Sequence, residues 1–261
     1  MRTTDMVDEL FRGPETELPA GVRLATAKRG GVTVTRVEIT REGLARPRGR
    51  YVTLEMPSVS VLDERDTDVI ETGAAELRAL LPPEGPVLVL GIGNRRVTAD
   101  ALGHRTAQKI LVTMGPQHTL PVRGIRPVAA LAPGVSGDTG LTLRQLAAAM
   151  VDAVRPAALI CVDSLCSAEA ARLGRTIQFS DTGLHPADAR HARHLDAAAL
   201  GVPVIAAGIP TLMDADEGAD LVLTPRALDS VIAHGSALLA GILNRALQPR
   251  LSVAQLCWLT G

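Results

Sequence analysis

Short runs of apolar residues, bounded by turn-forming residues, constrain the fold of this chain more than any other feature. They lie at residues 86–91, 128–132, 158–162 and 202–207, with a shorter one at 221–223. Such runs are typical of strands buried on both faces of a parallel sheet. Helical spacing of apolar residues occurs at 66–81, 99–113, 143–154 and 225–247. This alternation predicts an α/β fold with a mostly parallel or mixed sheet and helices on both faces.

The first 60 residues follow a different pattern. Residues 31–39 alternate apolar and polar side chains, which predicts a half-exposed strand, and residues 50–55 predict a second. Residues 1–20 are polar, acidic and punctuated by proline, so we expect a flexible arm there. We find no linker after residue 60. The sequence therefore predicts one α/β domain over residues 21–261, with an N-terminal strand extension.

Composition and charge exclude several classes of protein. With 46% hydrophobic and 21% charged residues, a packed core is expected. The formal net charge is −1 with scattered basic residues, which argues against nucleic-acid binding. Neither a signal peptide nor an apolar run of the roughly 20 residues that a membrane span needs is recognisable. The three cysteines show no zinc-ribbon pairing, so we expect a reducing cytoplasm and no cofactor.

The loop after residues 86–91 is the first candidate for chemistry, because sites in open α/β sheets form at the carboxyl ends of strands. Gly91 and Gly93, followed by Asn94, allow tight turns and close approach of the backbone. A dinucleotide-binding loop fits poorly, because Arg96 stands where its third glycine is needed. Asp100 follows. Its spacing alone favours a helix-opening residue over a site residue.

A second candidate is Asp163, where the apolar run at 158–162 ends. A carboxylate there is either a helix cap or a site residue, and the residues alone leave both open. Taken with Asp100, it suggests paired-carboxylate chemistry. Two close aspartates do not both ionise easily, so one can activate water while the other protonates or polarises a carbonyl.

Weaker candidates lie elsewhere. Asp181 and His185 in one loop could form an acid/base pair, although such a loop is more often a turn. Ser164 and Ser136 could suggest a serine nucleophile, but neither has the glycine-flanked elbow that one needs.

Three histidines, His185, His191 and His194, could bind a metal together with Cys161 or Cys166. The segment that carries them is rich in arginine and fits a solvated helix or loop more simply. We therefore expect no metal.

Seven stretches of the sequence match a known pattern in order. They are residues 49–55, 91–103, 125–127, 133–140, 180–186, 201–211 and 221–225. Together they cover most of residues 36–245 and resemble the germination proteases of spore-forming bacteria. The resemblance implies a three-layer fold shared with the hydrogenase maturation peptidases.

The same resemblance implies that Asp100 and Asp163 are the catalytic pair of an aspartate-dependent endopeptidase. Gly91, Gly93 and Asn94 would shape the loop beside them. The implied substrates are the small acid-soluble proteins that coat spore DNA, degraded in the spore core during germination. Family members are tetramers made as inactive zymogens, so we expect a homo-oligomer of the forespore cytoplasm. Asp181 and His185 are candidates for a supporting role.

The resemblance also suggests a role for the arm. The family cleaves after an acidic residue followed by a bulky apolar, a small and a polar residue, then Glu and another apolar residue. Residues 5–10, Asp-Met-Val-Asp-Glu-Leu, imitate that pattern. We therefore predict self-processing between Asp5 and Met6; an ordinary acidic arm is the alternative.

Two family features are missing, and two other functions stay open. Only residues 212–220 stand in place of a long family insertion, and residues 187–194 replace a glycine-containing family stretch. One alternative is a metal-dependent maturation peptidase that acts on the C-terminal tail of another enzyme. The other is an inactive paralogue that binds spore proteins or a fuller-length homologue.

Overall fold

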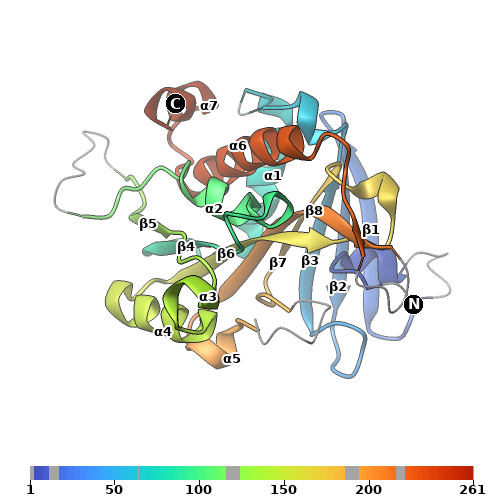
Figure 1. Ribbon diagram of the computed structural model, residues 1–261, viewed down its shortest axis with the longest axis horizontal. Coiled ribbons are helices and arrows are strands. Elements are labelled where there is room, and N and C mark those ends of the chain that lie inside the picture. The colour runs from blue at the N-terminus through green and yellow to red at the C-terminus, as the bar shows by residue number, and fades with distance from the viewer. Residues whose placement is uncertain are drawn as a thin grey trace.

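A computed structural model describes residues 3–11, 18–63, 65–115, 124–185, 194–215 and 221–260. Within these ranges, one mixed sheet of nine strands has the order β1-β2-β3-β7-β8-β6-β4-β5, with β9 paired to β8 (Figure 1). The strands are β1 (Val22–Arg29), β2 (Val32–Ile39), β3 (Gly49–Glu55), β4 (Val87–Gly91), β5 (Val128–Leu131), β6 (Ala158–Cys166), β7 (Thr176–Ser180), β8 (Val204–Asp214) and β9 (Val222–Leu223).

Strands β5, β4, β6 and β8 are parallel neighbours and form one half of the sheet. The four apolar runs become these strands, so the predicted α/β fold with a mixed sheet is confirmed. Two of them extend further than predicted, because polar residues continue the ladder: Asp163 pairs with Gly208, and Ser164 with Ile209. Asp163 therefore lies within β6, and the expectation that it ends the strand is wrong.

Strands β1, β2, β3 and β7 form the antiparallel half, which joins the parallel half where β7 pairs with β8. The strands expected at 31–39 and 50–55 are confirmed as β2 and β3. Strand β1 was not predicted. Most of its residues are exposed, so its sequence lacks the alternation of apolar and polar residues that a half-buried strand shows. Strand β7 was not predicted either, because the polar residues Thr176, Gln178 and Ser180 interrupt its apolar run. All five of its residues are nevertheless buried.

Helices cover both faces of the parallel half (Figure 1). Leu88, Leu90 and Leu159 pack towards α4 on one face, whereas Val89 and Ile160 belong to the larger cluster that contains α1 and α6. The helices are α1 (Thr67–Leu80), α2 (Leu102–Ala107), α3 (Ser136–Thr139), α4 (Leu143–Val154), α5 (Ala197–Leu200), α6 (Leu228–Leu247) and α7 (Val253–Thr260). Short 3-10 turns are η1 (Val7–Phe11), η3 (Val59–Val61), η4 (Thr98–Asp100) and η5 (Ala170–Arg172).

Helix α6 is the long apolar helix at the centre of this arrangement. Its length and mean hydropathy of 1.2 would suit a membrane span, but 72% of that window is buried inside the protein. It packs against α1 and α2, as the core helix of a folded domain does.

Helix α2 is shorter than the helix expected at 99–113. Beyond it, the Leu111 N–H donates to Asn244 Oδ1 of α6 (2.8 Å) and the Thr113 N–H to the Val128 carbonyl of β5 (2.9 Å). These partners replace two of the bonds that a longer helix would make.

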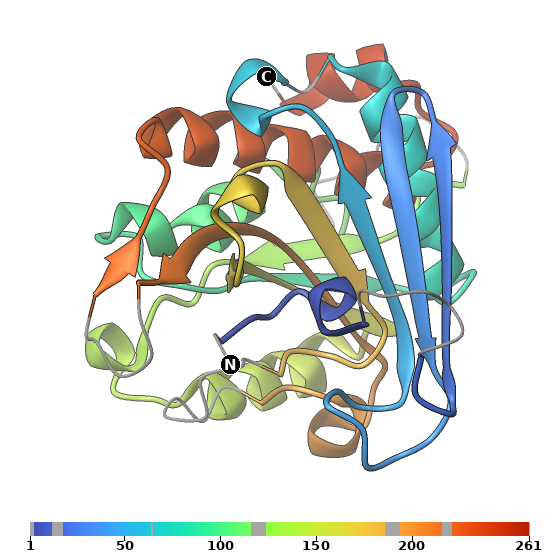
Figure 2. The same ribbon diagram turned by 90° about the vertical axis from the view of Figure 1, so that its right-hand side faces the viewer.

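The N-terminal segment, residues 3–11, differs from the mobile arm that the sequence suggested. Met6 and Val7 are 0% and 1% exposed, and Val7 and Phe11 pack with Val37 and Tyr51. Figure 2 shows η1 in front of the antiparallel half of the sheet. The segment thus covers the face of this half that carries no helix of the main core.

Candidate active site

The loop between β4 and η4 is closely packed around its glycines. A Cβ on Gly91 would lie 2.1 Å from the Gly103 carbonyl oxygen, and one on Gly93 would lie 2.0 Å from that of Asp100. Gly93 also has a φ of +109°, which side-chain-bearing residues rarely adopt. Both glycines therefore permit the loop to fold back onto the turn that carries Asp100.

Asp100 is the last residue of η4 and is half-buried. Its Oδ2 accepts a hydrogen bond from the Asn94 backbone N–H at 2.7 Å. No side-chain cap is present at the start of η4 or α2, so the helix-opening role does not apply. Asn94 itself accepts from the Arg96 N–H through its Oδ1. The carboxylate thus faces the glycine loop rather than a helix end.

Asp163, the second candidate aspartate, is only 5% exposed. Its Oδ1 accepts a hydrogen bond from the Ser164 backbone N–H at 2.9 Å. A Cβ on the neighbouring Gly208 would lie 2.4 Å from the Asp163 carbonyl oxygen, so β8 passes close to it. Burial, together with the charge of Asp163, raises the pKa of the Cys161 thiol, which excludes that cysteine as a ready nucleophile.

Hydrogen bonds connect the segments that carry the two aspartates. The Ile92 N–H, just beyond β4, donates to the Val162 carbonyl at 2.8 Å, one residue before Asp163. On the other side, Thr211 Oγ1 of β8 donates to the Ala99 carbonyl at 2.7 Å, one residue before Asp100. Both carboxylates therefore come from segments that are bonded to each other and to β8.

Asp181 does not pair with His185. Its carboxylate accepts from the backbone N–H and the Nε of Arg50, both at 2.7 Å, and so ties the end of β7 to β3. His185 instead lies with His194, with their Nδ1 atoms 3.1 Å apart, and its Nε2 is 2.9 Å from the Thr182 carbonyl oxygen. Burial is the main cause that lowers the pKa of His185.

The proposed metal ligands are brought together only in part. His185 and His194 are adjacent, but His191 lies outside the described residues. Cys161 is fully buried, and burial followed by the charge of Asp5 raises the pKa of Cys166 to about 12. No group of three or more potential ligands exists in the part of the chain that the structure describes.

Of the serine candidates, Ser164 has a buried hydroxyl that bonds to no partner, and Ser136 is exposed at the start of α3. Neither hydroxyl has a base that would activate it in the described structure.

The residues that hold the N-terminal segment by its main chain carry no recognisable signal in the sequence. The Asp5 N–H donates to the Cys166 carbonyl at 2.8 Å, and the Cys166 N–H donates back to Asp5 Oδ2 at 2.8 Å. Gln178 of β7 accepts from the Val7 N–H (2.7 Å) and donates to the Asp5 carbonyl (2.8 Å). Arg46 donates to the Thr4 carbonyl.

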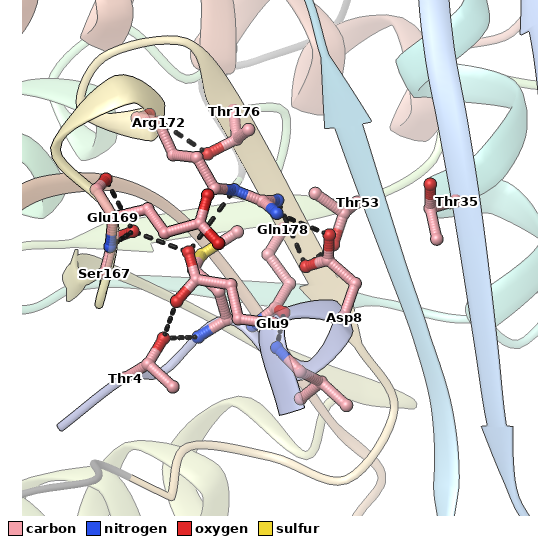
Figure 3. A network of polar contacts seen from close by, with 12 residues as sticks. Thr4, Asp8, Glu9, Thr35, Thr53, Ser167, Glu169, Arg172, Thr176 and Gln178 are labelled. Carbon is pink, nitrogen blue, oxygen red and sulfur yellow. Dashed lines mark hydrogen bonds and ion pairs between the residues drawn. The ribbon is translucent and has the colours of Figure 1, made fainter. Parts of the chain in front are cut away.

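A buried arginine holds the same segment by its acidic side chains (Figure 3). Arg172, with 4% of its side chain exposed, donates to both oxygens of Asp8 at 2.6 and 3.1 Å. Its Nε lies 3.3 Å from Glu9 Oε1, and Glu9 also accepts from Ser167 Oγ at 2.6 Å. The only sequence signal was the acidic pair itself, because nothing in the spacing singled out this arginine.

Comparisons with known proteins agree with the earlier resemblance. A family model described as germination protease matches residues 4–217, a range that contains both aspartates and most of the N-terminal segment. A germination protease of Clostridium perfringens (strain SM101 / Type A) is 32% identical over 278 residues, covering 84% of this chain and 86% of the relative. That of Caldanaerobacter subterraneus subsp. tengcongensis is 39% identical over 222 residues, covering 79% and 67%.

Among solved structures, the [NiFe] hydrogenase maturation protease HycI from Thermococcus kodakarensis matches with a TM-score of 0.43 and 16% identity. That match covers 66% of this chain and 98% of HycI. The family match spans the glycine loop, β6 and the N-terminal segment described above. By its sequence, the chain belongs to the germination protease family of peptidases.

Proposed function

We propose that the chain is an endopeptidase that begins the degradation of small acid-soluble spore proteins during germination, with Asp100 and Asp163 as its catalytic pair. The observation that carries the proposal is that Asp163 lies one residue beyond Val162, whose carbonyl accepts from the Ile92 N–H at the start of the loop that leads to Asp100. Family membership supports the peptidase activity.

In the proposed mechanism, one carboxylate takes a proton from water as the oxygen attacks the peptide carbonyl carbon. The other carboxyl group donates a proton to the leaving amine nitrogen when the C–N bond breaks. The two groups thus exchange roles once per turnover. Gly91, Gly93 and Asn94 hold Asp100 in place, because the Asn94 N–H binds its carboxylate.

The test is the cleavage of a purified small acid-soluble spore protein by the wild-type chain and by Asp163→Asn, with products identified by mass spectrometry. We expect cuts after Glu or Asp before an apolar residue, and none with the variant. Asp152→Asn, at an exposed position of α4, is the matched control and keeps full activity. Equal cleavage by Asp163→Asn and Asp152→Asn would remove Asp163 from the mechanism.

Two further measurements on the purified protein, of bound metal and of substrate binding, separate the two alternatives. Stoichiometric bound metal, or activity that a chelator removes, indicates the maturation-type peptidase. Binding of the spore protein without any turnover indicates the inactive paralogue.

We also propose that the chain is made as a zymogen and is cut between Asp5 and Met6. Met6 is fully buried and the Asp5 carbonyl accepts from Gln178, so the segment must leave its place before this bond can be cut. Mass spectrometry of the activated protein should find a chain that begins at Met6; a different or unprocessed N-terminus rejects this step.

The remaining parts of the proposal concern assembly and location. The chain is expected to work as a homo-oligomer in the cytoplasm of the forespore. Light scattering of the purified protein that gives the mass of a single chain, close to 27.3 kDa, would reject the oligomer.

A further inference from the structure

The exposed tip of the glycine loop carries two arginines next to a proposed catalytic aspartate. Arg95 and Arg96 are adjacent in the sequence, and both are exposed. The Val97 N–H donates to the Asn94 carbonyl at 3.0 Å, and the Asp100 N–H donates to the Val97 carbonyl at 2.9 Å. The arginines therefore lie in a tight turn that leads directly into the turn that ends at Asp100.

Asn94 fixes the position of this tip relative to the aspartate. Its side-chain Oδ1 accepts from the Arg96 N–H at 2.9 Å, while its own N–H donates to Asp100 Oδ2 at 2.7 Å. One residue thus holds the backbone of Arg96 and the carboxylate of Asp100 together. A side chain on a backbone fixed in this way can be placed precisely against a bound substrate.

Arg96 meets a carboxylate from the neighbouring loop. Its Nη1 lies 3.4 Å from Oδ1 of Asp138, which belongs to α3 in the loop that follows β5. Because β4 and β5 are parallel neighbours, both loops leave the carboxyl ends of the strands, where sites in open α/β sheets form (Figure 1). The pair is open to solvent, with 71% of the Arg96 side chain exposed, so it contributes little to stability. Another carboxylate can therefore replace Asp138 at low cost.

The charges at the tip favour an acidic ligand. Arg95 has no ion-pair partner among the residues that the structure describes, so Arg95, Arg96 and Asp138 together leave one positive charge unbalanced. The proposed catalytic carboxylates, Asp100 and Asp163, would by themselves repel an acidic side chain of a substrate. A guanidinium group offsets that repulsion and matches a carboxylate with two parallel N–H groups.

We infer that Arg96, assisted by Arg95, binds the acidic side chain of the substrate that precedes the cut bond, and that this side chain takes the place of Asp138. The inference rests on the proposed peptidase function. The two arginines determine specificity and take no part in proton transfer. Asp138 is a placeholder that keeps Arg96 paired while no substrate is bound.

Binding to a chain that does not cut tests the two arginines without any turnover. The chain carries Asp163→Asn, and the probes are two fluorescent peptides that differ only in Glu or Gln before a leucine. We expect the Glu peptide to bind about tenfold more tightly, as one charge-assisted hydrogen bond implies. Adding Arg95→Gln and Arg96→Gln should abolish this preference.

A matched pair of substitutions controls for net charge. Lys28→Gln with Arg29→Gln removes the same charge at exposed, adjacent positions of β1 in the other half of the sheet, and should keep the preference for the Glu peptide. No preference in the starting chain, or its loss in both doubly substituted chains, overturns the inference.

A further variant tests the exchange with Asp138. Asp138→Asn removes the competing carboxylate, so the Glu peptide should bind about two- to fivefold more tightly, whereas the Gln peptide should change little. Asp152→Asn, exposed on α4, should leave both affinities unchanged. Weaker binding of the Glu peptide to the Asp138→Asn chain would show that Asp138 supports the site and does not compete for it.

Cleavage then separates this inference from the proposed function. For the wild-type chain, kcat/KM should be about tenfold lower for the Gln peptide than for the Glu peptide, and the chain with Arg95→Gln and Arg96→Gln should not distinguish them. If both peptides are cut equally well by the wild-type chain, the peptidase stands and the inference fails. If the Glu peptide binds through the arginines but nothing is cut, the binding site stands and the peptidase proposal fails.

Discussion

The faces of the two halves of the sheet are covered through different kinds of contact. In the parallel half, β4 and β6 are buried on both faces by apolar side chains from α4 on one side and from the α1–α6 layer on the other. In the antiparallel half, one face shares the α1–α6 core, but the other is covered by the N-terminal segment through Val7 and Phe11. That segment is fixed by ion pairs and hydrogen bonds as much as by apolar contact.

We expect this difference to separate the tasks of the two halves. Apolar contacts on both faces make the parallel half rigid, and a rigid base suits carboxylates that must keep their geometry. Polar contacts to a single chain segment can be exchanged for hydrogen bonds to water. Chemistry should therefore depend on the parallel half, and processing of the N-terminal segment on the antiparallel half.

The largest expected effect is on chemistry, from Asp100→Asn in the parallel half. An amide oxygen still accepts from the Asn94 N–H, so the loop should keep its shape while the proton-transferring group is lost. We expect activity on a spore protein to fall about 10⁴-fold, with an unchanged melting temperature. Asp152→Asn serves again as the control. A variant that cleaves normally would break the assignment of chemistry to this half.

Next in size is the loss of stability from Arg172→Ala in η5, the turn between β6 and β7. Asp8 and Glu9 would stay buried without their cation, which should lower the free energy of unfolding by about 3–5 kcal/mol. Urea denaturation measures it. Arg23→Ala removes an arginine whose side chain is 78% exposed in its pair with Glu38, so it should cost less than about 1 kcal/mol. Similar losses for both variants would mean that the segment is not held by charge.

A smaller effect is expected from Gly93→Ala in the glycine loop. The added Cβ meets the Asp100 carbonyl, and the φ of +109° is strained for alanine, which together should cost about 1–3 kcal/mol. Because Asp100 must shift, cleavage should fall more than stability does. Gly137→Ala is the matched control, since nothing lies within 4 Å of its Cβ. Equal activity in the two variants would show that the loop does not position Asp100.

The smallest effect is a pH dependence of stability from His185. Burial lowers its pKa in the folded chain, so below the ordinary value of about 6.5 the unfolded chain takes up a proton that the folded chain does not. The contribution of His185 is thus present above pH 6.5 and is lost as the pH falls through its lowered pKa. His194, Asp196 and Arg46 are the charged neighbours.

Thermal melts at pH 7.5 and 5.5 compare the wild-type chain with His185→Gln. The variant should lose less stability on acidification, because glutamine does not titrate. His104→Gln, a histidine outside this cluster, should retain the wild-type difference. If His185→Gln retains it too, His185 makes no contribution to acid sensitivity.

Prediction from the sequence succeeded where the signal was local. The helix at 143–154 matches α4, including its capping box between Thr142 and Gln145, and the apolar run at 128–132 matches β5. The glycines and the two aspartates were selected by their place after apolar runs, and their role in a site stays a prediction. Two predictions from the sequence were wrong. Asp163 does not end its strand, because the register of β6 with β8 continues past it. Asp181 does not pair with His185, because Arg50, which is distant in the sequence, binds its carboxylate.

The sequence by itself determined the parallel half and the family, because a strand buried on both faces needs an unbroken apolar run and family motifs keep their order along the chain. Only the tertiary structure decided what the acidic N-terminal residues do. Arg172 pairs with Asp8 across 164 residues of sequence, and Gln178 bonds to Val7 across 171. Polar pairs of this kind have no periodicity, so their partners become known only when the chain has folded.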